Sequence, residues 1–528
     1  MKENMVSTLK YNNSNTFEYY ENGKKYKKYF SELYIDVIKV LNFLTEQNLK
    51  KGDRIGILAE NSYAWVVLDL ACILGGIVVA AFHTSNFENE LDDIFSRYKL
   101  EILCVDDKYI KNITCKGKVI EISNVIKQLD LEKVKQREYK EFSSKDEVFT
   151  MIFTSGTTGT PKAIELKSEI IEDFVFNLEK LFKVNSNDKI IMFLPLSHIL
   201  QRLYVYGAIL LKFNMVMTPP ENVIKALQID KPTILVAIPY FYQSIYNVVY
   251  GSIKSSVKNY IIFKMFLLIQ ALMPKRIKEK LRGKFLKPLI DFWGGKMRIL
   301  VTGGAAISKN VLKFYNYAGI TLYEVYGMSE LGPISINYPR NYKMGSVGKP
   351  LSGKKIRFDE NGQILVNSEM PWAKSYFNAS EIENNQVFKE EGYVATGDIG
   401  YVDKDGFLYI KGRIKEMIVL SNGKKVHPGI VENEFSNGNY IKQAAVFGEG
   451  ESFLTAVIVK NDNNVALENI ENEIKKINKK LPDHAKIKRF VIAKEDFNIS
   501  NKMISNSMKL NRTKIYETYK NQLMKIYS

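Results

Sequence analysis

Short apolar runs alternate with helix-like segments over the first 300 residues, and this alternation limits the possible folds more than any other feature of the sequence. Each run has the length of one buried strand. The runs cover residues 54–59, 77–82, 102–105, 190–194, 233–237 and 299–301. Strands that are apolar on both faces and are separated by helices predict parallel sheets covered by helices, which is the α/β class.

Helix signals support this interpretation. Residues 16–46 read as a strand turn followed by an amphipathic helix. Asn61 is expected to cap a long helix that runs through Leu74 and closes at Gly75–Gly76.

The pattern changes after about Lys343, where short alternating strands and tight turns such as Asp403–Gly406 begin. Because 528 residues are many for one compact unit, we expect at least two domains. We place an N-terminal domain at residues 1–413, with a small β-rich subdomain at about 343–413, and a smaller C-terminal α+β domain at 414–528.

A loop rich in hydrogen-bond donors follows the expected strand 148–153. Five hydroxyl side chains, two glycines and one lysine occur in the nine residues 154–162. Backbone N–H groups of such a loop can wrap phosphate oxygens, and the lysine adds a positive charge. The spacing differs from that of a Walker A loop. The candidate phosphate ligands are Thr154, Ser155, Gly156, Thr157, Thr158, Gly159 and Lys162.

Five further segments carry polar residues beside expected strands or turns. Four of them are weak evidence when taken alone: His198 in the segment 194–202 fits a structural role, a Gly-Gly pair and a Thr-Gly-Asp turn are common, and one lysine in a Lys-rich tail means little. Tyr326 offers a face for a purine, and Glu330 is a hard oxygen ligand. The candidates here are His198, Gly303, Gly304, Ala305, Tyr326, Gly327, Ser329, Glu330, Asp398 and Lys509.

Together these segments resemble the adenylate-forming superfamily of acyl-CoA synthetases, luciferases and peptide-synthetase adenylation domains. The resemblance extends from about Asn61 to Arg512, and the residues of the motifs are most similar to those of the long-chain fatty acyl-CoA synthetase branch. It implies that Lys509 orients the carboxylate and the α-phosphate, and that Glu330 and Thr154 hold Mg²⁺. Ser329, Ser505 and Ser507 stand where the family usually has threonine. Ser329 keeps the hydroxyl that a phosphate contact needs, whereas the departures at Ser505 and Ser507 bear on catalytic efficiency more than on the type of reaction.

The resemblance also assigns roles around the domain boundary. Arg413 would contact the ribose and phosphate, and Asp398 would accept hydrogen bonds from the ribose hydroxyls. Lys415 would be the hinge of a mobile C-terminal domain. Gly423 lies in a loop that would help to form the pantetheine tunnel. Gly303, Gly304 and Ala305 would lie against adenine, and His198 would border the acyl carboxylate.

The expected function is ATP- and Mg²⁺-dependent activation of a medium- or long-chain fatty acid to acyl-AMP, followed by thioester formation with coenzyme A. Two alternatives remain open: delivery to a carrier-protein phosphopantetheine, and a non-catalytic protein that binds nucleotide or fatty acid. The apolar segments 204–211 and 236–242 fit either an acyl tunnel or ordinary core packing.

The net charge of +17 comes from 75 basic and 58 acidic residues that are spread along the chain. Nucleic-acid binding would rest on this charge alone, so we expect none. Residues 252–298 hold 12 basic and 2 acidic residues and fit either peripheral contact with an anionic membrane or a solvated helix face. Three cysteines without metal-site spacing, and no signal-peptide or membrane-spanning pattern, predict a cytoplasmic enzyme.

Overall fold

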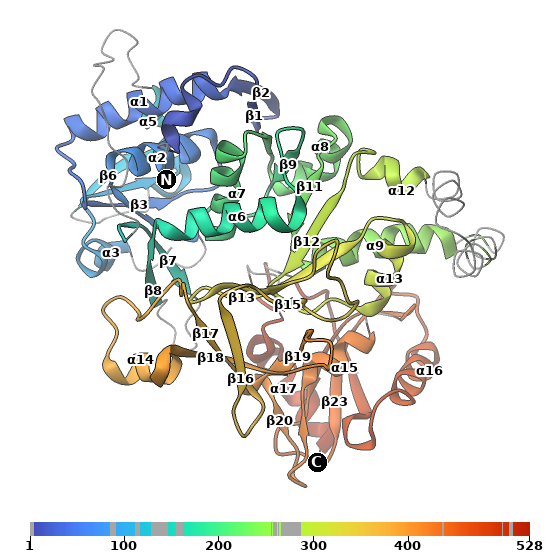
Figure 1. The fold of residues 1–528 in the computed structure, drawn as a ribbon. Coiled ribbons are helices and arrows are strands. Elements are labelled where there is room, and N and C mark those ends of the chain that lie inside the picture. The colour runs from blue at the N-terminus through green and yellow to red at the C-terminus, as the bar shows by residue number, and fades with distance from the viewer. Residues whose placement is uncertain are drawn as a thin grey trace.

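The computed structural model describes most of the chain and shows mixed sheets with helices in a large N-terminal region, followed by a smaller C-terminal region (Figure 1). This confirms the predicted α/β class. The described residues are 5–84, 91–110, 117–127, 146–154, 162–254, 256, 261, 263, 265, 287–435, 438–498, 500–505 and 510–527. Most of the basic segment 252–298, the loop residues 155–161 and residues 506–509 therefore lie outside the described part.

A six-stranded sheet has the order β6-β5-β3-β4-β7-β8, in which only the β7–β8 pair is antiparallel. Helix α2 follows β3 and is buried from Tyr63 to Leu74, which explains why its sequence is apolar on all sides. The elements of this part are β3 (Arg54–Leu58), α2 (Tyr63–Gly75), β4 (Val78–Ala81), α3 (Leu91–Tyr98), β5 (Ile102–Val105), α4 (Asp107–Ile110), β6 (Lys118–Glu121), α5 (Ile122–Lys127), β7 (Val148–Thr154) and β8 (Lys162–Lys167).

The predicted cap of α2 is wrong by one residue. Ser62 is the N-cap, and its hydroxyl accepts a hydrogen bond from the Trp65 N–H at 3.2 Å. Asn61 instead bonds the backbone of the segment before His198, donating to the Leu194 carbonyl and accepting from the Leu196 N–H, both at 2.7 Å. Both residue types can cap a helix, and a tertiary contact decides between them. The helix ends at Gly76, whose φ is +66°, as the sequence predicts.

A nine-stranded sheet has the order β15-β14-β13-β12-β11-β9-β10-β1-β2 and is parallel from β13 to β1. Antiparallel strands form both of its edges. Its strands are β1 (Thr16–Glu21), β2 (Lys24–Tyr29), β9 (Lys189–Met192), β10 (Asn214–Met217), β11 (Ile234–Ala237), β12 (Ile299–Gly303), β13 (Leu322–Met328), β14 (Gly332–Ile336) and β15 (Lys349–Pro350).

Helices cover both faces of this sheet. The largest buried cluster joins it to the six-stranded sheet through residues such as Val67, Ile164, Ile190 and Leu203. A second cluster on the other face contains Tyr242, Trp293 and Tyr315. The helices are α1 (Phe30–Glu46), α6 (Glu169–Phe182), α7 (Ile199–Leu210), α8 (Val223–Asp230), α9 (Pro239–Lys254), α12 (Lys287–Phe292) and α13 (Lys309–Tyr317).

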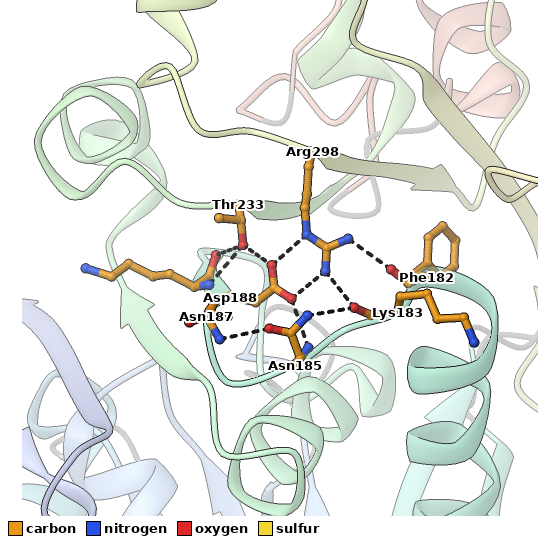
Figure 2. Close-up of polar contacts among 8 residues, drawn as sticks. Phe182, Lys183, Asn185, Asn187, Asp188, Thr233 and Arg298 are labelled. Carbon is orange, nitrogen blue, oxygen red and sulfur yellow. Dashed lines mark hydrogen bonds and ion pairs between the residues drawn. The ribbon is translucent and has the colours of Figure 1, made fainter.

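A polar network ties the end of α6 to the starts of β9 and β12 (Figure 2). Arg298 pairs with Asp188 through Nε at 2.8 Å and also through its second terminal nitrogen. The same guanidinium donates to the Phe182 and Lys183 carbonyls at 2.9 and 3.1 Å, which satisfies the exposed carbonyl end of the helix.

The β-rich part is a four-stranded antiparallel sheet in the order β16-β17-β18-β19. The Asp403–Gly406 turn predicted from the sequence joins its last two strands, with the Gly406 N–H 2.9 Å from the Asp403 carbonyl. The elements are β16 (Lys354–Phe358), β17 (Gln363–Ser368), α14 (Glu381–Val387), β18 (Tyr393–Val402) and β19 (Leu408–Arg413).

The C-terminal region has its own three-stranded sheet, β22-β23-β24, with helices packed against it. Its buried clusters contain only residues from Ile418 onward among those described, and the other clusters end at Ile410. The boundary at 413–414 and the hinge at Lys415 stay predictions. The elements are β20 (Ile418–Val419), β21 (Lys425–Val426), α15 (Pro428–Phe435), β22 (Ile441–Phe447), β23 (Leu454–Lys460), α16 (Leu467–Asn478), β24 (Ile487–Ile492) and α17 (Arg512–Tyr527).

None of the helices in the described ranges is long and apolar enough to cross a membrane.

Candidate active site

Three polar side chains predicted from separate motifs meet where β13, β18 and β19 come together. The Tyr326 hydroxyl donates to Asp398 Oδ2 at 2.8 Å, and Arg413 Nε lies 3.2 Å from Asp398 Oδ1. The β18–β19 register places Asp398 opposite Arg413. Burial, with the Asp398 carboxylate beside the phenol, raises the pKa of Tyr326 well above its usual range. The tyrosine is therefore a permanent donor to Asp398.

The backbone of Thr396–Asp398 is fixed before any ligand binds. The Thr396 hydroxyl donates to the Ile364 carbonyl at 2.9 Å and accepts from the Asp398 N–H at 3.1 Å. Gly397, with φ of +73°, donates its N–H to Gln363 Oε1 at 3.1 Å. Asp398 is only 7% exposed, so its carboxylate is held in one orientation.

The Gly-Gly pair lies at the carboxyl end of β12, next to the strand that carries Tyr326. Gly303 is opposite Val325, and a Cβ on it would lie 2.8 Å from the Val325 carbonyl oxygen. Gly304 has φ of +84° with open space beside it, and Ala305 is exposed. Gly327, at a β-bulge after Tyr326, would clash with the Gly332 carbonyl if it had a side chain. Ser329 is partly buried two residues further on.

A second cluster joins Lys162 to Glu330 through a tyrosine that the sequence did not indicate. Glu330 is 6% exposed, and its Oε1 accepts the Tyr376 hydroxyl at 2.6 Å. The Lys162 ammonium lies 4.9 Å from the centre of the same ring and 3.3 Å from Glu383. Thr154 and Lys162 are paired across the β7–β8 hairpin, with the Thr154 hydroxyl donating to the Lys162 carbonyl at 3.3 Å.

These residues fit a magnesium ion on chemical grounds. Glu330 accepts one hydrogen bond from Tyr376, and a carboxylate has further lone pairs for a hard cation. Mg²⁺ is usually held by one or two carboxylates together with substrate phosphates, so Glu330 is a suitable carboxylate ligand, and the Thr154 hydroxyl would be a further oxygen ligand.

His198 begins α7 as its N-cap residue and is exposed. Its ring meets that of His83 edge to face, with the ring centres 5.8 Å apart. His83 follows β4, and burial lowers its pKa. None of the sequence motifs indicated His83, although it directly follows the predicted strand 77–82, at the end of a parallel-sheet strand where ligand sites are expected.

The remaining candidates lie in the C-terminal region or outside the described residues. Lys415 is exposed in the short 3-10 turn η6 (Ile414–Glu416). Gly423, with φ of +77°, closes the exposed turn between β20 and β21. Ser155, Gly156, Thr157, Thr158, Gly159, Ser507 and Lys509 lie outside the described part of the chain, so their roles stay predictions.

Comparison with known protein families gives two matches that cover most of the sequence. The model described as AMP-binding enzyme matches residues 11–369, and the model described as AMP-binding enzyme C-terminal domain matches residues 415–528. The chain belongs to the AMP-binding enzyme family. This confirms the resemblance found in the sequence motifs.

Among curated members of this family, the chain is similar to long-chain-fatty-acid–CoA ligases. It is 26% identical to FadD15 of Mycobacterium tuberculosis, over 92% of this chain and 90% of that protein. It is 25% identical to long-chain-fatty-acid–CoA ligase 5 of Mus musculus, over 90% of this chain and 80% of that protein.

Solved structures of AMP-binding enzymes share the fold. The o-succinylbenzoate CoA synthetase of Bacillus subtilis, in complex with its acyl-adenylate, matches with a TM-score of 0.74 and 20% identity over 97% of both chains. The A domain of carboxylic acid reductase from Segniliparus rugosus, with AMP and a carboxylic acid, matches with a TM-score of 0.79 and 17% identity over 99% of this chain and 93% of that one.

Proposed function

We propose that this protein is an ATP-dependent fatty acid–CoA ligase that forms an acyl-AMP and then a thioester with coenzyme A. Medium- and long-chain acids are the expected substrates. The proposal is supported by family membership and by relatives that are named long-chain-fatty-acid–CoA ligases. The structural observation that carries it is the Tyr326–Asp398–Arg413 cluster, three side chains with the chemistry of a nucleoside site held in one place.

The first step joins a fatty carboxylate to ATP. A carboxylate oxygen attacks the α-phosphorus, the bond to the bridging oxygen breaks, and pyrophosphate leaves. Negative charge builds up on phosphate oxygens, so fixed positive groups accelerate the step. Lys162 already faces an anion, Glu383, and a phosphate oxygen would replace that partner. Glu330 and Thr154 would hold a magnesium ion, which would supply further positive charge to the phosphates when bound, and Lys509 would orient the carboxylate.

The nucleoside is expected at the cluster around Asp398. The two oxygens of this carboxylate accept hydrogen bonds from the Tyr326 hydroxyl and the Arg413 Nε–H. An acidic side chain held in this way is the type of acceptor that binds ribose hydroxyls in nucleotide sites. The open space beside Gly304 lies at the edge where adenine is expected. In the second step the thiol loses its proton to solvent, the thiolate sulfur attacks the acyl carbonyl carbon, and AMP leaves with the electrons of the broken carbon–oxygen bond.

The decisive experiment is ATP–pyrophosphate exchange that depends on an added fatty acid, from acetate to oleate. Exchange should appear with a medium- or long-chain acid and fall by about 10²–10³-fold in Lys509→Ala, because one preorganised charge is lost. Lys520→Ala, an exposed lysine on α17, is the matched control and should leave exchange unchanged. Absence of exchange with every acid in the wild type contradicts the proposed activity.

The thiol acceptor is proposed to be free coenzyme A, and a carrier-protein phosphopantetheine is the competing acceptor. The two acceptors are compared at equal concentration with the acid selected above. Thioester formed only on the carrier protein would overturn the coenzyme A assignment.

We further propose a cytosolic enzyme that makes peripheral contact with anionic membranes beside α9. Val248, Ile261 and Met265 are exposed by 73%, 52% and 55%, and the segment 252–298 is strongly basic in sequence. Apolar side chains flanked by lysines favour an anionic lipid surface. Sedimentation with phosphatidylserine vesicles should carry the protein down at low salt, whereas phosphatidylcholine vesicles should not. Equal behaviour with both vesicle types rejects the contact.

A further inference from the structure

The described residues on the two sides of positions 506–509 pair with each other, and we call these paired residues, 503–504 and 510–511, the base of the Lys509 segment. Ile504 and Leu510 form an isolated antiparallel bridge, and the Asn511 N–H donates to the Met503 carbonyl at 2.9 Å. Met503 and Ile504 are buried, so the base of this segment belongs to the packed core. The described residues that flank positions 506–509 are therefore anchored in this core.

Arg512, the first residue of α17, lies directly after that base and is held by two carboxylates. One terminal nitrogen pairs with Glu432 on α15, and the other lies 3.3 Å from Glu416. The Glu432 side chain is 10% exposed and also accepts the Val446 N–H at 2.9 Å. Arg512 thus connects the base of the Lys509 segment to α15 and, through Glu432, to β22, which is the edge strand of the C-terminal sheet.

The ion pair between Arg512 and Glu416 also reaches the turn beside the proposed hinge. Glu416 is the last residue of η6, next to the proposed hinge residue Lys415, and its side chain is 46% exposed. One guanidinium therefore bridges the hinge-side turn and the base of the segment that bears the adenylating lysine. The chain separates Glu416 from Arg512 by 96 residues, so no local contact could supply the same link.

We propose that Arg512 is a positioning residue for the adenylation step, because its ion pairs with Glu416 and Glu432 fix the base of the Lys509 segment relative to the hinge. This inference rests on the proposed function. A displacement of a reacting group by about 1 Å can lower a rate by roughly 100-fold. The thioester-forming step does not use Lys509, so it should not depend on Arg512 in the same way.

The test separates the two half-reactions in purified full-length protein. In Arg512→Gln we expect acid-dependent pyrophosphate exchange to fall by about 10- to 100-fold. Thioester formation from chemically prepared acyl-AMP and coenzyme A should stay within about twofold of wild type when scaled to the folded fraction. Arg512→Lys should recover exchange only in part, since a single ammonium matches one carboxylate and not two.

Arg298→Gln is the matched control, because Arg298 is also held by a carboxylate and by helix carbonyls but lies in the N-terminal region (Figure 2). It should change both half-reactions by the same factor. If Arg512→Gln does not fold, Glu416→Gln removes only the exposed partner and should lower exchange selectively. Equal loss of both half-reactions in the Arg512 or Glu416 variant, or no loss in either, overturns the inference. Absence of exchange in the wild type instead overturns the proposed function.

Discussion

At the scale of single residues, the sequence indicated the three residues of the proposed nucleoside cluster, but it did not indicate the residue that holds Glu330, the proposed metal ligand. Tyr326, Asp398 and Arg413 were recognisable because each lies in a short motif at a strand end or turn. Tyr376 lies 46 residues beyond Glu330 in an irregular segment without periodicity. Its hydroxyl reaches Glu330 only through the tertiary fold, so no local pattern could predict the contact.

Tyr376→Phe removes that hydroxyl and leaves the ring in place. A hydrogen bond to a charged group contributes about 1.5–3 kcal/mol, so Glu330 should lose orientation and the Mg²⁺ concentration for half-maximal exchange should rise several-fold. Tyr315→Phe is the control: its buried hydroxyl donates to the Tyr242 carbonyl at 3.0 Å, away from the candidate site. The role assigned to Tyr376 is wrong if both variants lower the melting temperature alike and neither changes the magnesium dependence.

At the scale of elements, local patterns predicted strands and helices well, and contacts between elements could not be read from them. The strand run at 102–105 is reproduced as β5, whereas the α2 cap moved from Asn61 to Ser62 because Asn61 bonds the distant Leu194–Leu196 backbone. The Arg298 network at the end of α6 (Figure 2) was likewise unforeseen. These contacts join residues more than 100 positions apart.

A buried ion pair between α2 and α7 leads to an element-scale prediction. Arg202 is fully buried, pairs with Asp69 and donates to Thr150 Oγ1 at 2.6 Å, while the Tyr206 hydroxyl donates to Asp69 at 2.6 Å. Removing one charge leaves the other buried and unpaired, which destabilises by about 3–5 kcal/mol. Arg202→Leu should therefore lower the free energy of unfolding in urea by about that amount.

The double variant Asp69→Leu with Arg202→Leu serves as the control for this pair. It leaves no unpaired charge, so it should be more stable than Arg202→Leu alone. If the double variant is less stable than Arg202→Leu alone, the unpaired buried charge is not the cause of the lost stability.

At the scale of the whole molecule, one lysine joins the β-rich sheet to the turn that carries Glu330. Lys354 on β16 donates to the Leu331 carbonyl at 2.9 Å, the Ser368 hydroxyl at 2.7 Å and the Met370 carbonyl at 3.4 Å. The sequence showed Lys354 only as one of two adjacent lysines in the region after about Lys343, where short strands and tight turns are expected. Alternation alone could not tell which one points inward, because a register shift of one residue exchanges the faces.

Burial lowers the pKa of Lys354 to about 8, against the partial compensation of Asp173. The unfolded chain, with an ordinary lysine pKa of 10.5, therefore binds more protons than the folded protein between pH 8 and 10.5. The free energy of unfolding should gain about 2–3 kcal/mol from this group as the pH rises through that window.

Urea unfolding at several pH values, compared between wild type and Lys354→Met, isolates the effect, since the variant should lack this rise. Lys355→Met, the exposed neighbour on the same strand, should keep it. An identical pH dependence in wild type and Lys354→Met would show that the ammonium is not buried between the two sheets. The link between the β-rich sheet and the Glu330 turn would then have to depend on the Ala373 N–H bond to the Glu330 carbonyl and on Tyr376.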